Sequence, residues 1–414
     1  MKNIALLILV PLMAVAGIAA TFIAVLGYVL PELAAPHAPW VMDAWFQALI
    51  KFALLILVVV MPFASLLTWA ERRESAMMQD RLGPNRAAIL GFKAWGIFHF
   101  VADAAKMIFK EDFVPAKANR FLFALAPCLA IIPVFVIFII IPFGSDICVH
   151  HLFDVVSDPN VCSDRVSMQV ARLDVGLLFY FAIASLAVYG TTLAGWASYN
   201  KWSLLGGMRA SSQMMSYEVT MGMAVLGAFL VYGSLEPYGI VQGQGTNLLH
   251  WGFVTQPLGC LLFFVAAVAE TKRAPFDTPE GESEVIGYFI EYSGMRFGTF
   301  FLAEFIEVVF TGAIMTTVFF GGFNVPFLSP DGFHFGESAL NLPHVAVLLI
   351  QTTFWTFKIV CFCWLQLLIR WSYPRFRPDQ LMNLGWKQLL PASIANILVT
   401  AAVVLAMMAS ASHQ

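Results

Sequence analysis

The chain has 414 residues, of which 60% are hydrophobic and only 12% are charged, and its formal net charge is −3. This composition excludes an ordinary soluble globular protein, because repeated apolar runs of about 20 residues are typical of membrane-spanning helices. The near-neutral charge, without a basic stripe that carries interleaved aromatic residues, argues against nucleic acid as a partner. No run alternates like the strands of a transmembrane barrel, so the sequence predicts an all-α, polytopic membrane protein.

About nine spans are expected, and their order along the chain defines the topology. They are residues 4–30, 47–70, 121–143, 174–196, 214–234, 253–270, 299–321, 345–370 and 389–409. The first follows Lys2 like the start of a signal peptide, but its apolar run exceeds the roughly 7–15 residues of a signal's apolar core. We therefore predict one membrane domain over 1–414, in which 1–46 adds an N-terminal helix and an outer loop.

The connections between the spans differ sharply in basic residues. Seventeen Lys and Arg fall in 71–120, 197–213, 271–298 and 371–388, whereas the alternate connections from residue 31 onward carry only Arg165 and Arg172. Lys and Arg stay on the cytoplasmic side of a membrane protein. The sequence therefore predicts a multi-pass membrane protein whose N-terminus is on the cytoplasmic side and whose C-terminus is on the outer side.

The first cytoplasmic connection, 71–120, begins at Glu71-Arg72-Arg73 and turns at RLGPNR (81–86), because Gly-Pro-Asn cannot continue a helix. A helix over about 92–110 is expected after that turn. Its polar stripe consists of His99, Asp103, Lys106 and Lys110. Two interpretations stay open: an amphipathic helix in the membrane interface, or a helix whose Asp103 and Lys106 line a polar cavity under the bundle.

The acidic loop, which we define as 271–298 with Glu270 before it, is the most unusual stretch of the chain. Its carboxylates are Glu270, Asp277, Glu280, Glu282, Glu284 and Glu291. Closely spaced carboxylates near low dielectric cannot all ionise, because each charge raises the pKa of its neighbours. Such a cluster holds shared protons and responds to any new charge nearby.

Further ionisable residues fall inside the expected spans. Glu218 lies about one turn into the fifth span, Glu304 and Glu307 lie in the seventh, and Lys358 lies in the eighth. An intramembrane charge is costly unless it is paired or neutralised, so each is a functional candidate. One alone would suit a structural polar contact, whereas several on different spans favour a hydrated polar path.

The cysteines predict little chemistry. Cys361 and Cys363 point to different faces of one apolar helix, which is typical of core residues. The outer connection 144–173 contains Cys148 and Cys162, which could form a disulfide on an oxidising side. A metal site built from these two with His150 and His151 is the weaker interpretation.

Eight stretches of the chain together resemble one family. They are ERR (71–73), RLGPNR (81–86), ADAAKMIFKED (102–112), AGWASYNK (194–201), LLGGMRASSQMMSYE (204–218), ETKRAPFDTPEGESE (270–284), IEYSGM (290–295) and YPRFRPDQLMNLGWK (373–387). In order and in topological side they are similar to the H-type membrane subunits of proton-pumping NADH:quinone oxidoreductase, respiratory complex I. The resemblance covers about residues 47–409.

The resemblance implies a protein that binds no cofactor itself, is inactive alone and helps to enclose a chamber for the substrate quinone. FMN and iron–sulfur clusters would lie in partner subunits, and further partners would be small membrane subunits, antiporter-like subunits and membrane lipid. The implied chamber and loop residues are Arg72, Arg73, Arg81, Asp103, Lys106, Arg273, Phe276, Asp277 and Arg296. The implied proton-coupling residues are Glu71, Glu218, Glu270, Asp277, Glu280, Glu282, Glu284 and Glu291.

In this interpretation the acidic loop senses the charge of reduced quinone, and Glu218, with Glu71 and Asp103 nearby by family analogy, passes the change into the membrane. Asp277 is the strongest single candidate, because it follows the rigid Pro275-Phe276 turn. The alternative is that the acids only anchor the loop to basic surfaces, which suits Glu282 and Glu284 best. The basic segment 373–387 is interpreted as an assembly surface at the membrane edge, against a direct role in the quinone path.

Two other functions compete with this one. A homologous membrane subunit of a hydrogenase- or formate-linked complex would use no quinone, and the complete PFDTPEGESE loop weighs against it. A free-standing ion transporter commonly shows two related halves, and no internal repeat is visible here.

Overall fold

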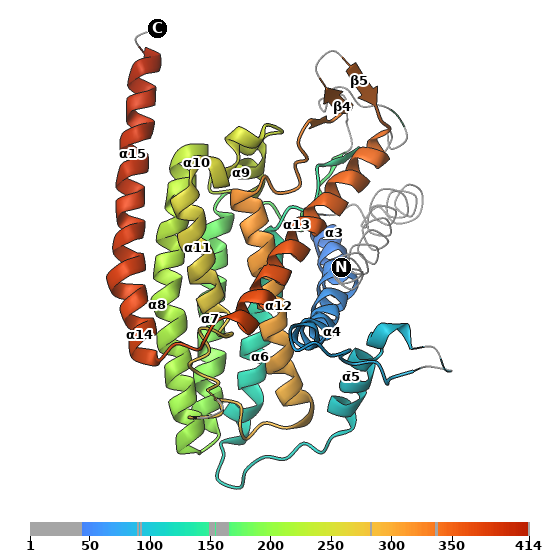
Figure 1. Cartoon of the computed structure of the whole chain (residues 1–414), viewed down its shortest axis with the longest axis vertical. Helices are drawn as coiled ribbons and strands as arrows, with labels where there is room; N and C mark the ends of the chain where they lie inside the picture. Colours follow the sequence, from blue (N-terminus) through green and yellow to red (C-terminus); the bar gives the residue numbers. More distant parts are fainter. Residues whose placement is uncertain are drawn as a thin grey trace.

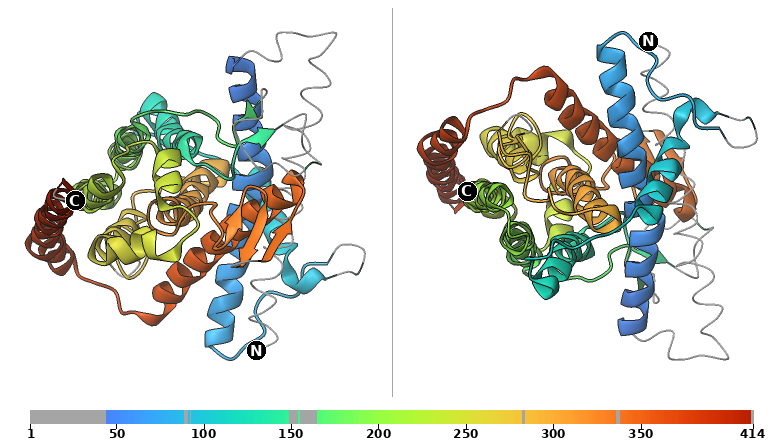
Figure 2. Two further views of the ribbon diagram at one scale, coloured as in Figure 1. Left: turned by 90° about the horizontal axis from the view of Figure 1, so that it is seen from above. Right: turned by 90° about the horizontal axis from the view of Figure 1, so that it is seen from below.

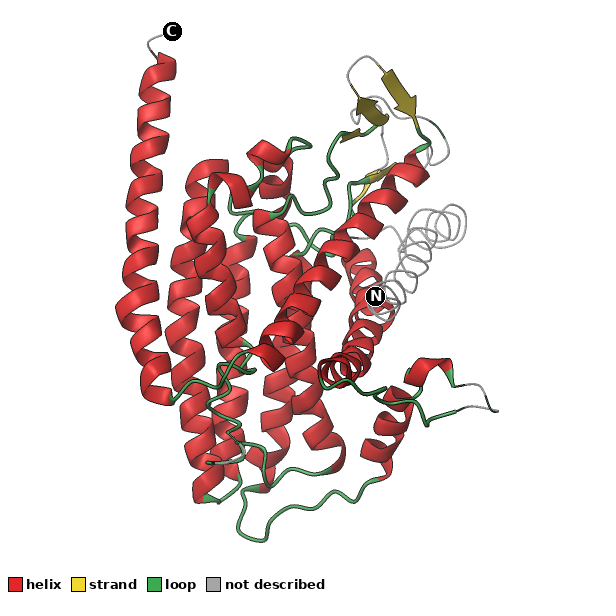
Figure 3. Cartoon of the chain, in the orientation of Figure 1, coloured by secondary structure: helices red, strands yellow, loops and turns green. Residues whose placement is uncertain are grey.

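The computed structural model describes residues 44–88, 91, 93–148, 154, 165–281, 284–335 and 338–412, and most of them are helical (Figures 1 and 3). The α-helices before the acidic loop are α3 (Ala44–Leu54), α4 (Met61–Met78), α5 (His99–Phe109), α6 (Arg120–Val136), α7 (Gly176–Ala197), α8 (Lys201–Tyr232), α9 (Pro237–Gln244), α10 (Gly252–Thr255) and α11 (Pro257–Glu270). Those after it are α12 (Gly294–Phe319), α13 (His344–Ser372), α14 (Pro378–Asn383) and α15 (Leu390–Ser412).

Short π or 3₁₀ segments connect or extend these helices. They are η3 (Leu55–Val60), η4 (Ala94–Gly96), η5 (Ile137–Ile140), η7 (Leu248–His250) and η8 (Leu384–Leu389). The strands are β1 (Ile147–Cys148), β2 (Arg165–Val166), β3 (Leu328–Ser329), β4 (Gly332–Phe335) and β5 (Ser338–Asn341). β1 and β2 form one antiparallel pair, and β3, β4 and β5 form a three-stranded antiparallel sheet in chain order.

The prediction of an all-α polytopic membrane protein is confirmed. Within the described residues, seven helical stretches are long and apolar enough to cross a membrane, and the 14-residue α11 is a shorter apolar helix. These eight coincide with the second to ninth expected spans. The expected first span, 4–30, lies outside the described residues and stays a prediction.

A continuous helical stretch, Phe46–Met78, runs through α3, η3 and α4 along one side of the molecule (Figure 2). Its 33 residues correspond to about 50 Å of helix, which exceeds the roughly 30 Å of a bilayer's hydrocarbon core. It leans relative to the other helices, whereas α15 stands on the opposite side of the bundle. The stretch ends just before the turn predicted at 81–86.

The helix expected over 92–110 is shorter than predicted, because it begins only at His99. Gly96 lies at φ 87°, and a Cβ there would come within 1.9 Å of the Pro84 carbonyl oxygen. The chain must therefore reverse at Gly96, against the RLGPNR turn, before α5 can start. Trp95, at φ 51°, belongs to the same reversal, and its carbonyl accepts a hydrogen bond from Trp69 Nε1.

The bundle core forms around α12, which is the most buried of the candidate spans. Phe263 of α11 and Phe305 and Phe319 of α12 are almost completely buried there. Helices α6 and α7 approach closely where a Cβ on Gly190 would lie 2.6 Å from the Ala130 backbone nitrogen. Small residues allow such approach in membrane bundles.

The two ends of the bundle carry different elements (Figure 1). The strands, α9 and α10 lie at one end, which we call the sheet end. The acidic loop and α5 lie toward the other end, which we call the acidic-loop end. The connection 322–344 lies at the sheet end and contains β3 to β5.

Candidate functional site

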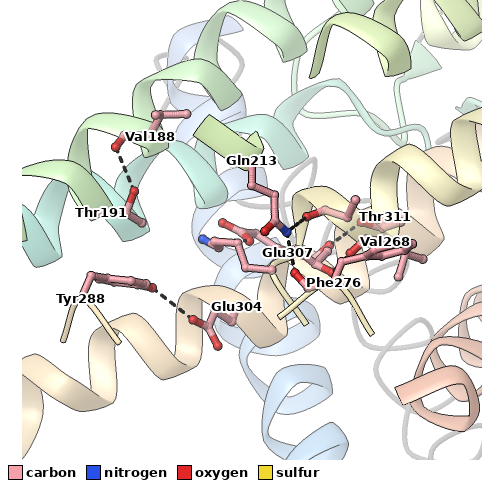
Figure 4. Close-up of polar contacts among 12 residues, drawn as sticks. Val188, Thr191, Gln213, Val268, Phe276, Tyr288, Glu304, Glu307 and Thr311 are labelled. Carbon is pink, nitrogen blue, oxygen red and sulfur yellow. Dashed lines mark hydrogen bonds and ion pairs between the residues drawn. The ribbon is translucent and has the colours of Figure 1, made fainter. Parts of the chain in front are cut away.

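The acidic loop folds back into the bundle where α11 ends, and its first turns are buried. Lys272 takes a left-handed conformation, at φ 56°, that turns the chain sharply after Glu270. From α8, Gln213 Nε2 donates to the carbonyls of Ala269, at 2.7 Å, and Phe276, at 2.6 Å (Figure 4). The Phe276 ring stacks on Phe376 at 5.3 Å. These contacts hold residues 272–278 inside the protein.

Glu71 at the end of the long leaning helix bridges two arginines that are far away in sequence. Its Oε2 lies 3.1 Å from Arg273 Nη1, and its Oε1 lies 2.5 Å from Arg370 Nη1 on α13. Arg273 is 7% exposed and stacks over the Phe305 ring. Burial alone would lower the pKa of Arg273, but nearby carboxylates, Glu71 above all, raise it overall. The guanidinium therefore stays charged inside the bundle.

Asp277, the strongest candidate from the sequence, is also buried beside an arginine. Its Oδ2 lies 2.7 Å from Arg375 Nη2, and its Oδ1 accepts the backbone N–H of Glu280 at 3.1 Å. Burial raises the pKa of Asp277 to about 6, although Arg375 opposes the shift. Its charge can therefore change near physiological pH.

Glu280 and Glu304 form a carboxyl pair deeper in the site. Tyr288 Oη donates to Glu304 Oε1 at 3.1 Å, and Glu280 Oε1 is buried with no hydrogen-bond partner among the described residues (Figure 4). Burial, and then the neighbouring Glu304, raise the pKa of Glu280 well above its usual range. Two such carboxyls share protons rather than ionise independently.

The next group of charges lies at the base of the loop. Lys272 is 3% exposed, and its Nζ lies 3.6 Å from Glu307 Oε2. Burial opposes its charge, but Glu307, Glu304 and other carboxylates raise the pKa of Lys272 overall. This lysine therefore carries a positive charge among the carboxylates.

A small cavity continues the series of acids into the membrane. It measures about 30 Å³, enough for one water, and Glu270, Glu307, Tyr180 and Thr311 are among its lining residues. Glu270 also interacts electrostatically with Glu218 of α8. We define the buried charge chain as Glu71, Arg273, Asp277, Glu280, Glu304, Lys272, Glu307, Glu270 and Glu218.

Other predicted site residues lie outside this chain of buried charges. Arg72 pairs with Asp103 of α5 at 2.6 Å, and Arg296 pairs with Asp112 at 3.1 Å, both with partly exposed side chains. Arg73 donates to the Leu82 carbonyl, and Arg81 and Lys106 are exposed. The structure therefore leaves both interpretations of the α5 stripe open, with Asp103 tied to α4.

Two loop acids bond instead to α8 and to Asn200, the residue that caps its N-terminus. Glu284 is about half exposed and pairs with Arg209 at 2.7 Å, while Glu291 Oε1 accepts from Asn200 Nδ2 at 2.7 Å. This is the anchoring arrangement that the alternative interpretation expects of Glu284. Glu282 and Cys162 lie outside the described residues, so the coupling role of Glu282 and the Cys148–Cys162 pairing stay predictions.

Lys358, the ionisable residue of the eighth expected span, has different surroundings from the acids of the buried charge chain. Its Nζ donates to the carbonyls of Phe320, Gly322 and Asn324 at 2.7, 2.8 and 2.9 Å, just beyond the end of α12. A cation at a helix C-terminus is favourable. Lys358 therefore lies at the sheet end as a structural contact, away from the buried charge chain.

Sequence reasoning did not place Arg370, Arg375 or Lys272 in the site, and it overlooked Glu74. Arg370 and Arg375 belong to or adjoin the segment interpreted as an assembly surface, yet they contact Glu71 and Asp277. The positive charge of these arginines can be seen in the sequence, but their pairing with carboxylates far away in the chain cannot. Among the described residues, no group of three His, Cys, Asp or Glu side chains could hold a metal ion.

Comparisons with known proteins agree with this architecture. A family model described as NADH dehydrogenase matches residues 50–401. "NADH-quinone oxidoreductase subunit 8" of Rhodothermus marinus is 42% identical over 364 residues, which are 86% of this chain and 96% of the relative. An H subunit of NADH-quinone oxidoreductase from Cytophaga hutchinsonii is 40% identical over 339 residues, covering 82% and 91% of the two chains. The chain therefore belongs to the NADH dehydrogenase family, together with membrane proteins named as H subunits of NADH-quinone oxidoreductase.

Proposed function

We propose that this protein is the membrane subunit of a proton-translocating NADH:quinone oxidoreductase that encloses part of the quinone chamber. Its carboxylates couple quinone reduction to proton movement. The acidic-loop end faces the cytoplasm of a bacterial inner membrane, because the connections there carry most of the Lys and Arg. Electrons arrive through FMN and iron–sulfur clusters of partner subunits, so the chain is inactive alone. The names of its relatives favour this function over a hydrogenase- or formate-linked complex.

The observation that carries the proposal is the buried charge chain. It extends from Asp277 in the acidic loop to Glu218 on a membrane-spanning helix, and it combines incompletely bonded carboxyls with buried cations. Burying so many ionisable groups is costly for stability. A purely structural loop would not need them, whereas a proton-coupling path does.

The arrangement supports a charge-driven change in proton occupancy. Full reduction of a quinone adds two electrons and requires two protons, so an anionic intermediate places negative charge beside the chamber wall. That charge attracts Arg273 and Arg375 and raises the proton affinity of carboxyls such as Glu280. Protons then redistribute along the buried carboxyls toward Glu218, and antiporter-like partner subunits respond beyond it.

The role of Asp277 is tested by Asp277→Asn in the assembled complex. The amide keeps the size of the side chain but cannot ionise. We therefore expect NADH-driven quinone reduction to fall by about a hundredfold, which is the lower end of the range of rate losses seen when a positioned proton-transfer group is removed. Electron transfer from NADH to an artificial acceptor stays normal. The exposed acid Asp174, which precedes α7, is the matched control when it is changed to Asn.

The pH profile sharpens this test. Because the pKa of Asp277 is about 6, its carboxylate takes up a proton as the pH falls through about 6, and the ion pair with Arg375 is lost. Quinone reduction by the native complex therefore declines over this pH range. The Asp277→Asn variant lacks that step. Normal quinone reduction in the variant would contradict the proposed function of the loop.

A further inference from the structure

Glu74 is a buried acid that the proposed coupling path does not yet use. It lies on α4 one turn beyond Glu71 and is followed by the buried Ser75 and Ala76. Its side chain is 3% exposed, and neither carboxyl oxygen has a hydrogen-bond partner among the described residues. Residues three apart on a helix lie on the same face, with their Cβ atoms about 5–6 Å apart. Glu74 therefore stands next to Glu71 without sharing its arginines.

The charged and titratable groups on the elements packed against α4 are engaged elsewhere or exposed. On α5, Asp103 pairs with Arg72, His99 bonds to the Gly96 carbonyl and Lys106 is exposed. On α12 and α13 the engaged groups are Arg296 with Asp112, Glu304 with Tyr288, Glu307 with Lys272, Lys358 with three carbonyls and Arg370 with Glu71. Within the described part of the chain, Glu71 is the group that interacts electrostatically with Glu74.

This environment does not suit an ionised Glu74. An isolated carboxylate in an apolar interior is so unfavourable that the group takes up a proton instead. Glu71, by contrast, forms ion pairs with two guanidinium groups. The helix face therefore carries an acid without a counter-charge beside an acid that has two.

We propose that Glu74 is a proton-carrying residue that supplies Glu71, as an additional member of the coupling path. In the transfer, the O–H bond at Glu74 breaks and an O–H bond forms at Glu71, so one carboxylic acid and one carboxylate exchange roles without any electron transfer. The proposal rests on the proposed function, because the path has a use only where quinone reduction drives proton movement.

The two arginines of Glu71 provide the trigger. Arg273 also interacts electrostatically with Glu280 and Glu304, and Arg370 interacts with Asp277. When negative charge develops on the acidic loop or on the quinone beside it, these cations are drawn away from Glu71. The proton affinity of Glu71 then rises, and Glu74 is the adjacent donor.

The test uses the assembled complex with Glu74→Gln and Glu74→Leu. Glutamine keeps the shape and polarity of a neutral carboxylic acid but holds no transferable proton, while leucine keeps only the apolar bulk. We expect both variants to assemble and to reduce an artificial acceptor normally. Coupled quinone reduction falls by about a hundredfold in both, as on removal of a positioned proton donor. Asp174→Asn is again the control.

An infrared difference spectrum, recorded on quinone reduction with ¹³C-labelled glutamate, supplies a readout that a structural role would not change. The native complex loses the band of one protonated glutamic acid, and Glu74→Gln lacks that change. Native turnover and spectrum in Glu74→Gln would overturn the proposal, as would an active Glu74→Leu or failure of both variants to assemble. If Asp277→Asn is impaired while Glu74→Gln is normal, only this inference fails; if both are normal, the proposed function fails.

Discussion

The two ends of the bundle bury charge in opposite ways. At the sheet end, the Lys358 ammonium donates to three carbonyls, and Gln244 bonds through both its amide nitrogen and its amide oxygen. At the acidic-loop end, Glu280 and Glu307 each keep a buried oxygen without a hydrogen-bond partner among the described residues. The Lys358 ammonium therefore has its three hydrogen bonds, whereas these two carboxyls do not complete theirs.

This difference separates structural from functional polarity. A buried group whose hydrogen bonds are complete stabilises one arrangement and has no capacity to take another proton or partner. A carboxyl with a free buried oxygen costs stability and persists where its proton is needed. Among these buried Lys and Glu side chains, incomplete hydrogen bonding is therefore a better indicator of the site than charge alone.

The largest effect is expected from Lys358→Met, which tests whether Lys358 is a structural contact. The change removes three donors and leaves buried carbonyls unsatisfied, so the free energy of unfolding falls by about 3 kcal/mol or more. Thermal denaturation of the purified complex measures the loss, with exposed Lys387→Met as control. Quinone reduction per assembled complex stays native. A stable complex that no longer reduces quinone would instead place Lys358 in the coupling path.

A smaller effect is expected from Glu218→Gln at the membrane end of the buried charge chain. The neutral amide cannot exchange a proton with the neighbouring Glu270 region, so coupled quinone reduction falls about tenfold, a barrier change of about 1.4 kcal/mol. Proton pumping by reconstituted vesicles gives the measurement, and Glu236→Gln at the sheet end is the control. Absence of the complex from the membrane would show that Glu218 is structural.

The smallest effect belongs to Glu284→Gln. Its ion pair with Arg209 is partly exposed, and such pairs contribute at most about 1 kcal/mol. Quinone reduction should therefore stay within about twofold of native when it is assayed beside Asp277→Asn. A loss as large as that of Asp277→Asn would show that partly exposed loop acids take part in coupling, and it would weaken the contrast between bonded and unbonded carboxyls.

The sequence predicted the fold well, because its signals are local. Apolar runs define the eight described spans, and Gly83-Pro84-Asn85 predicts the turn after the long helix. The start of α5 was predicted too early, because the clash that forces the reversal involves the Gly96 position and the distant Pro84 carbonyl. The predicted helix boundary was thus wrong where a tertiary contact determines the start of the helix.

The site was predicted only in part for the same reason. Asp277 and Arg273 stand out in a short acidic loop, whereas the pairing of Arg375 with Asp277 depends on how α13 crosses the bundle. Glu74 sits in a run of charges, ERRE, that resembles an ordinary membrane-edge sequence. Its burial, and its lack of hydrogen-bond partners in the described part of the chain, become visible only in three dimensions.

The bridge at Glu71 has a consequence for biogenesis. Glu71 and Arg273 are separated by 202 positions, and Arg370 is contributed by a helix made later still. During synthesis, the long leaning helix therefore enters the membrane well before Arg273 and Arg370, the two partners of its Glu71, have been made. Until α13 is inserted, Glu71 lacks its Arg370 partner, so the bridge that ties the second expected span to the last third of the chain is completed late in synthesis.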